Sequence, residues 1–186
     1  FFISAVWMSG FIGKNSQAAN QIALNLSSMT YMVALGVGVA AMIRVGNQRG
    51  MMNFKKLREV ALSTILLIIS IDVIFCMIFL FFNDFLPLLY LDPNNPSSLN
   101  DVNQVLEIAS KLLIVAGVFQ LFDGIQAVVL GALRGMQDVN KPAIIIFLSY
   151  GVIGFPISYY LGFYTSLSMV GIWLGLLSGL LSSSLF

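Results

Sequence analysis

Two carboxylates stand inside long apolar stretches of this sequence, where a charge is unexpected. Asp123 lies about the middle of one stretch, and Asp72 lies near the middle of another. An ionised carboxylate in hydrocarbon is costly, so such a group is expected to face a neighbouring helix or a water-filled cavity. The chemistry open to it there is the uptake and release of H⁺ or Na⁺.

Asp123 has polar neighbours on its own helical face. At helical spacing it is accompanied by Phe119, Gln126 and Leu130, with Gln120 close by. Arg134 is eleven residues further on, roughly 16 Å along a helix axis, so the two cannot pair within the helix. Two interpretations follow: a site that takes up a cation, or a structural carboxylate hydrogen-bonded to a neighbouring helix. We favour the first, because acids inside membrane spans usually serve function.

Asp72 lacks such neighbours, since Cys76 and Phe79 follow it on the next two turns. Structural pairing, or a position near a water-filled cleft, is therefore as consistent with the sequence as transport. A third polar set opens the second apolar stretch, where Gln21, Asn25 and Ser28 share one helical face. These side chains could join helices by hydrogen bonds or could line a substrate path, and spacing alone does not choose between the two. If a substrate path is present, we expect it to be lined by these three residues together with Phe119 and Gln126.

The composition places these acids in a membrane protein. Of the 186 residues, 59% are hydrophobic and 9% are charged, whereas soluble domains have roughly 25% charged residues. The chain has no histidine and one cysteine, which excludes a disulfide framework, a Cys/His metal cluster and a histidine-based catalytic triad within it. An enzyme is therefore not expected. A net charge of +1 does not suggest a nucleic-acid partner.

Six apolar segments predict an all-α, six-helix transmembrane bundle. None alternates with period two, and within a bilayer only helices or closed barrels satisfy the backbone. The segments are Phe1 to Gly13, about Ala18 to Val45, about Val60 to Phe82, about Val105 to Leu133, Pro142 to about Tyr164, and about Ser168 to the end. The first is too short for a span and the last has no polar stop, so we expect both terminal helices to be truncated. Pro156 predicts a kink in the fifth span.

The charges of the links predict the orientation. The link from Asn47 to Glu59 is basic, and Arg134 and Lys141 flank the link after the fourth helix. The other side is mainly acidic. By the positive-inside rule the basic side is cytoplasmic, in a multi-pass protein of the cell (inner) membrane. Residues Arg49 to Arg58 could bind anionic lipid headgroups, although the positive-inside rule already explains them.

Several segments, taken together, resemble the multidrug and toxic compound extrusion (MATE) family in its NorM-like branch. Each motif alone is weak, but their order and spacing extend over nearly the whole chain. The matching segments are Gln21-Ile22-Ala23-Leu24-Asn25-Leu26-Ser27-Ser28, Ile43-Arg44-Val45-Gly46, Phe119-Gln120-x-x-Asp123-Gly124-Ile125-Gln126, Leu133-Arg134-Gly135-x-Gln137-Asp138 and Pro142.

The resemblance implies that residues 1–186 form the C-terminal lobe, helices seven to twelve, which pairs with an N-terminal lobe of the same protein. Such proteins are secondary transporters without cofactors that exchange Na⁺ or H⁺ for cationic, amphipathic drugs. Asp123 falls on the acid of the family's C-lobe cation site, and Tyr31 on a tyrosine that some relatives place near the bound cation. Phe119 stands where sodium-coupled relatives often have tyrosine. The family's helix-seven glutamate would lie just before Phe1, so the coupling ion stays open.

Two alternatives compete with a drug exporter. A flippase for lipid-linked oligosaccharides or lipids, from the same superfamily, would need basic residues in its cavity to bind phosphate, and the spans contain almost none. A membrane scaffold would be indifferent to the loss of Asp123.

Overall fold

The computed structural model describes residues 2–91, 99–165 and 167–185, and within them the secondary structure is helical. The helices are α1 (Phe2–Ile12), α2 (Lys14–Gly50), α3 (Phe54–Phe81), α4 (Leu99–Gly135), α5 (Asn140–Leu148), α6 (Phe155–Phe163) and α7 (Ser168–Leu185). A π-helical turn, η2 (Ser149–Gly154), joins α5 to α6 without a break, and a short 3₁₀ helix, η1 (Leu86–Leu89), follows α3. Counting α5, η2 and α6 as one span, the predicted six-helix bundle is confirmed.

Four of these helical segments are long and apolar enough to cross a membrane: Lys14–Gly50, Phe54–Phe81, Asn100–Gly135 and Asn140–Phe163. Ser168–Ser183 is a shorter apolar helix. The many large apolar side chains on the outside, Phe147 at 75% exposure among them, fit a surface that lipid covers. The chain is therefore a multi-pass integral membrane protein.

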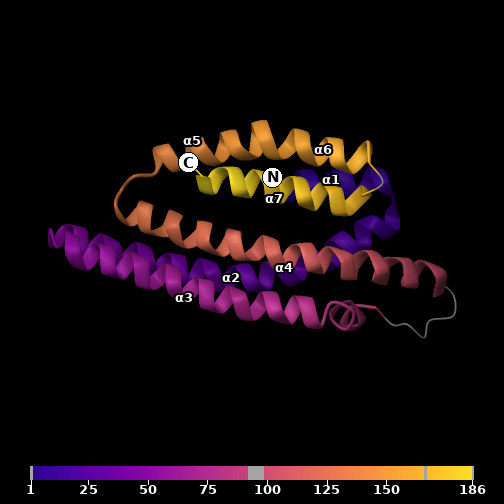
Figure 1. Ribbon diagram of the computed structural model, residues 1–186, viewed down its shortest axis with the longest axis horizontal. Helices are drawn as coiled ribbons and strands as arrows, with labels where there is room; N and C mark the ends of the chain where they lie inside the picture. The colour runs from indigo at the N-terminus through magenta and orange to yellow at the C-terminus, as the bar shows by residue number, and fades with distance from the viewer. Residues whose placement is uncertain (1, 92–98, 166, 186) are drawn as a thin grey trace.

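The helices form two groups, which Figure 1 shows one above the other. The long helices α2, α3 and α4 lie side by side in one group, and α1, α5–α6 and α7 make up the other. The main apolar core joins the groups through Trp173 of α7, which is fully buried and donates a hydrogen bond to Asn20 Oδ1 at 3.0 Å. Because α2 and α4 contribute to the cores on both sides, they form the frame of the bundle.

At one end α2 and α4 touch backbone to backbone through four glycines, which we call the glycine contact: Gly38, Gly46, Gly131 and Gly135. A Cβ on Gly38 would lie 2.9 Å from the carbonyl oxygen of Ala127, and one on Gly131 would overlap the backbone of Gly38. Small residues at helix interfaces permit such close approach and are common where membrane helices pack. The glycine contact therefore sets the separation of α2 and α4.

The link between α2 and α3 is shorter than predicted. The expected link from Asn47 to Glu59 is reduced to residues 51–53, because α2 continues to Gly50 and α3 begins at Phe54. Residues with good helix propensity, Gln48 and Arg49 on α2 and Lys55 to Glu59 on α3, extend the helices beyond the apolar segments. The reversal uses Met52 in the left-handed conformation (φ 54°), with Asn53 N–H bonded to Gln48 O, and Asn53 then caps α3 by accepting from Lys56 N–H.

The turn after α4 is built in the same way, although Gly135 does not make it. Gly135 is the last residue of α4 and packs on Met42 and Gly46 of α2. Gln137 takes the left-handed position (φ 60°), and Asp138 N–H bonds to Leu133 O. Gly135 thus ends α4 and, because it has no side chain, also permits the close packing of α4 on α2.

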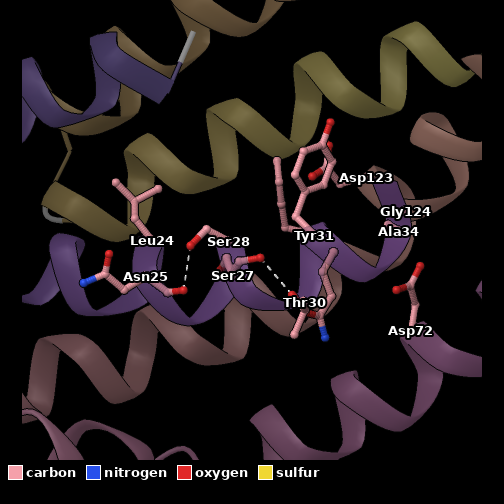
Figure 2. A pocket seen from close by; sticks show the side chains of 12 residues that line it. Leu24, Asn25, Ser27, Ser28, Thr30, Tyr31, Ala34, Asp72, Asp123 and Gly124 are labelled. Atoms are coloured by element: carbon pink, nitrogen blue, oxygen red, sulfur yellow. Dashed lines mark hydrogen bonds between the residues drawn. The ribbon is translucent and has the colours of Figure 1, made fainter. Parts of the chain in front are cut away.

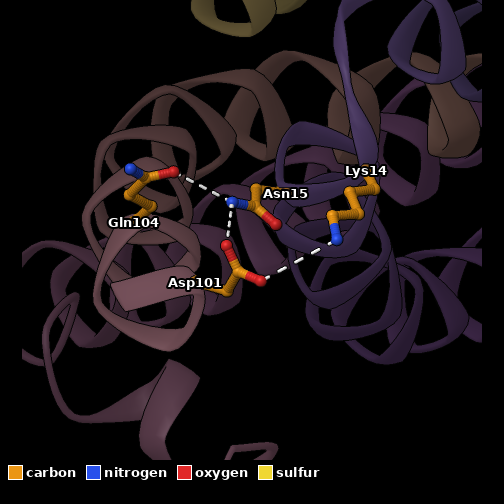
Figure 3. A network of polar contacts seen from close by, with 4 residues as sticks. All are labelled: Lys14, Asn15, Asp101 and Gln104. Atoms are coloured by element: carbon orange, nitrogen blue, oxygen red, sulfur yellow. Dashed lines mark hydrogen bonds and ion pairs between the residues drawn. The ribbon is translucent and has the colours of Figure 1, made fainter. Parts of the chain in front are cut away.

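At the opposite end a polar network ties the start of α2 to the start of α4 (Figure 3). Asn15 Nδ2 donates to Gln104 Oε1 at 2.9 Å and to Asp101 Oδ1 at 3.2 Å, and Lys14 Nζ lies 3.9 Å from Asp101 Oδ2. All of these side chains are solvent-exposed, so the contacts add little stability. They place the first turns of α2 and α4 at the same end, as the charge-based orientation requires.

Candidate functional site

A cavity of about 330 Å³ opens between α2, α3 and α4. Its lining is mainly apolar but includes both intramembrane acids. The lining residues are Leu24, Asn25, Ser27, Ser28, Thr30, Tyr31, Ala34, Asp72, Phe119, Gln120, Asp123 and Gly124. Lys and Arg are absent from this set, so the charge that the lining can carry near neutral pH is negative.

Polarity around the cavity changes with depth. Asn25, Ser28 and Tyr31 of α2 are exposed and form the outer part, where Ser28 Oγ donates to Asn25 O at 2.8 Å. Thr30 and Gln120 are buried and face each other across α2 and α4, with Thr30 Oγ1 donating to Gln120 Oε1 at 2.8 Å. The deeper wall therefore has a polar contact in an otherwise apolar interior, and such a contact positions one helix against the other.

Asp123 lies on the side of the cavity that faces the second helix group. Figure 2 shows it beside Tyr31, with both side chains on the same edge of the cavity. Asp123 is partly exposed, and it lies within electrostatic range of the phenols of Tyr31 and Tyr150. The elements α2 and η2, which are far apart in the sequence, thus each place one tyrosine near the Asp123 carboxyl.

Asp72 enters the cavity from α3 on the other side, which agrees with the predicted alternative of a position near a cleft. Its side chain points toward Gly124 and Ala34 (Figure 2) and is 2% exposed. A Cβ on Gly124 would collide with the Asp72 carboxyl, so the glycine is what lets the acid reach the α4 backbone. The two acids of the sequence therefore line one cavity and lie within electrostatic range of each other.

Phe119 forms part of the boundary between the cavity and the main core. It is 3% exposed and packs edge-to-face on Trp173, with ring centroids 5.9 Å apart. This arrangement is the favoured geometry for aromatic pairs. Phe119 therefore lines the cavity and also holds α4 against α7.

Two of the predicted lining residues lie elsewhere. Gln21 is exposed and donates to Asn25 Oδ1 at 3.4 Å, outside the cavity lining. Gln126 points away from the cavity to the neighbouring flank of α4, where it accepts from Tyr150 Oη at 3.0 Å and donates to Ser183 Oγ at 2.6 Å. Residues three apart differ by about 60° around a helix, and this rotation carries Gln126 away from the Asp123 side toward η2 and α7.

The cavity lining also includes residues that the sequence did not predict. Ser27, Thr30 and Ala34 follow the predicted polar face of α2 but sit on its buried edge. Gly124 was quoted only as part of a motif, although its missing side chain accommodates Asp72. A glycine directly beside an intramembrane acid was the available signal, because it often marks a place where another group approaches the backbone. Within the described residues, there is no cluster of three His, Cys, Asp or Glu side chains that could hold a metal ion.

The MatE family profile matches residues 1–160 of this sequence. The chain belongs to the MatE family. It is 38% identical over 181 residues to a protein of Agrobacterium fabrum named "Probable multidrug resistance protein NorM", covering 96% of this chain and 38% of that protein. A Bacillus subtilis protein of the same name is 37% identical over 164 residues, which is 88% of this chain and 34% of the relative. This MatE chain thus spans less than two fifths of the length of these relatives.

Solved MATE structures share the fold. A eukaryotic MATE transporter, AtDTX14, superimposes with a TM-score of 0.86 at 20% identity, over 99% of this chain and 40% of that one. A MOP superfamily transporter from Pyrococcus furiosus gives the same TM-score at 18% identity, over 99% and 38% of the two chains. At such identities the likeness extends to the helix arrangement and no further.

Proposed function

We propose that this MatE chain is the C-terminal lobe, helices seven to twelve, of a multidrug exporter. The exporter would exchange cationic, amphipathic drugs for Na⁺ or H⁺ across the inner membrane, as a secondary transporter without catalytic chemistry or a cofactor. The relatives named as probable multidrug resistance proteins support this, as does the share of their length that the chain covers. The N-terminal lobe would be its partner in alternating access.

The observation that carries the proposal is the cavity with two carboxyls, an apolar lining and no cationic side chain. An apolar wall with a few polar groups suits an amphipathic ligand, and negative charge suits a cationic one. Asp123 would bind the coupling cation and the drug in turn, since it is the acid that remains partly exposed. Tyr31 would hold one edge of that site, and Asn25, Ser28 and Phe119 would line the path of the drug.

The test is drug resistance of a sensitised bacterial strain that expresses the full-length protein. Asp123→Asn keeps the shape of the side chain and removes its charge, so protection against ethidium and norfloxacin should fall to that of the empty vector. Asp84→Asn is the matched control, because Asp84 is an exposed acid outside the cavity. Full protection by Asp123→Asn at equal expression would refute the role of this acid.

The same cavity argues against a flippase for lipid-linked oligosaccharides. Phosphate recognition needs Lys, Arg or a helix N-terminus, and the lining has neither Lys nor Arg. Transport of a lipid-linked substrate by the reconstituted protein, without drug transport, would reverse this ranking.

A further inference from the structure

One oxygen of the Asp72 carboxyl is buried in the protein without a partner among the described residues. This atom, Oδ2, has no hydrogen-bond partner within the part of the chain that the structure describes, and the whole residue is 2% exposed. An unpaired carboxylate buried in a protein costs several kcal/mol by order of magnitude unless a proton, a water molecule or a cation compensates it. Something must therefore balance Asp72 in the working protein.

A purely structural role does not account for this acid. A structural carboxylate joins two helices through hydrogen bonds, whereas Asp72 rests against Gly124, whose backbone belongs to the interior of α4. A partner from the rest of a longer protein would also fail to reach it, because the side chain is already covered by this chain alone. A group that balances the carboxyl would therefore enter through the cavity that Asp72 lines.

The surroundings of Asp72 favour a positive charge. The titratable groups that line the cavity with it are Asp123 on α4 and Tyr31 on α2, and neither supplies a cation. Two further polar atoms of the lining also lack partners among the described residues, Ser27 Oγ and Gln120 Nε2. Elsewhere in the same cavity, a hydroxyl can accept from an ammonium group or ligate a cation, and an amide can donate to a water molecule.

We propose that Asp72 forms a second cation subsite of this cavity, separate from Asp123, for a small monovalent cationic group. The chemistry is shared by hydrated Na⁺ and by an ammonium group carried on a drug. The inference rests on the proposed transport function and adds to it that one lobe holds two cationic groups at once. With both acids in use, drug and coupling ion need not compete for a single carboxyl.

The experiment measures ²²Na⁺ binding to purified full-length protein, and drug affinity in the same preparations. If Na⁺ is the occupant, Asp72→Asn lowers the number of bound Na⁺ per protein by one. If an ammonium group is the occupant, Na⁺ binding is unchanged, but affinity for norfloxacin falls about tenfold relative to tetraphenylphosphonium, since a charge-assisted hydrogen bond is lost only for the drug with an N–H. No change in either measurement would overturn the proposal.

A second variant separates the subsite from a folding defect. Gly124→Ala leaves the charge of Asp72 in place but pushes its carboxyl from the α4 backbone. Gly124→Ala should weaken the binding of Na⁺ or norfloxacin at least severalfold less in the Asp72→Asn background than in the wild-type protein. The reason is that both changes act on one interaction. Fully additive effects would count against the subsite.

The two proposals fail in different ways. If Asp123→Asn abolishes efflux while Asp72→Asn changes neither binding measurement, only the second subsite is wrong. If Asp123→Asn protects cells fully, the proposed function of Asp123 is wrong whatever Asp72 does.

Discussion

The helix pair α2 and α4 is built in two ways along its length. At the glycine contact the backbones touch, and the interface has no room for a side chain. Around the cavity the same two helices are joined by the Thr30–Gln120 hydrogen bond, and space for a ligand remains between them and α3. The difference shows how one continuous helix pair can be closely packed at one end and can leave space for a ligand in another part of its length.

The largest effect is expected at the glycine contact. Gly131→Ala would drive a methyl group into the backbone of Gly38, and overpacking of this kind destabilises by about 1–3 kcal/mol. The melting temperature of the purified protein should fall clearly. Gly36→Ala is the control on the partner helix, because a Cβ there meets nothing within 4 Å. Equal melting temperatures for the two variants would show that the contact is not tight.

A smaller effect is expected in the cavity half. Thr30→Val keeps the shape of the side chain but leaves Gln120 Oε1 without its donor, at a cost of about 1–2 kcal/mol. Thr30→Ser retains the hydroxyl and should lose less than half as much. The comparison in the same melting assay fails if Val and Ser are equally destabilising, because packing and not the hydrogen bond would then be responsible.

The smallest effect is a gain at the end of the glycine contact, where α4 leaves α2. Gln137 holds a left-handed backbone conformation (φ 60°), which glycine adopts without steric penalty. Gln137→Gly should therefore stabilise the protein by about 0.5–1 kcal/mol. Gln137→Ala should show no gain, and an equal gain for alanine would contradict the conformational explanation.

The helices could be predicted from the sequence because hydrocarbon imposes simple rules on composition and length. The ends of the helices could not, since α2 continues through polar residues from Asn47 to Gly50, outside the apolar segment. The position of Asp123 on a cavity could be predicted, because an ionised carboxylate is costly in hydrocarbon. The arrival of Asp72 at the same cavity could not, because that depends on α3 packing against the bare backbone at Gly124, a contact between residues 52 positions apart. The position of Gln126 outside the cavity depends on how α4 is rotated about its axis. The spacing of residues in the sequence fixes that rotation only to within tens of degrees.

The π-turn η2 has a consequence for how this span tolerates changes in length. Phe155 N–H bonds to Tyr150 O, five residues back, so the turn contains one residue more than an α-helical turn. It lies just before Pro156, where a kink was predicted, and Figure 1 shows the span bowed there. Tyr150, Gly154 and Ser158 of this span pack against Gly175 and Gly179 of α7.

Deleting one residue from Ser149–Gly154 would therefore be tolerated by the backbone, which would close into an ordinary α-helix. It would nevertheless turn α5 by about 100° against α6. Tyr150 would leave Gln126, and the two halves of the span would then present mismatched faces to α7. For this span the number of residues is thus a packing constraint in itself, independent of which residues they are.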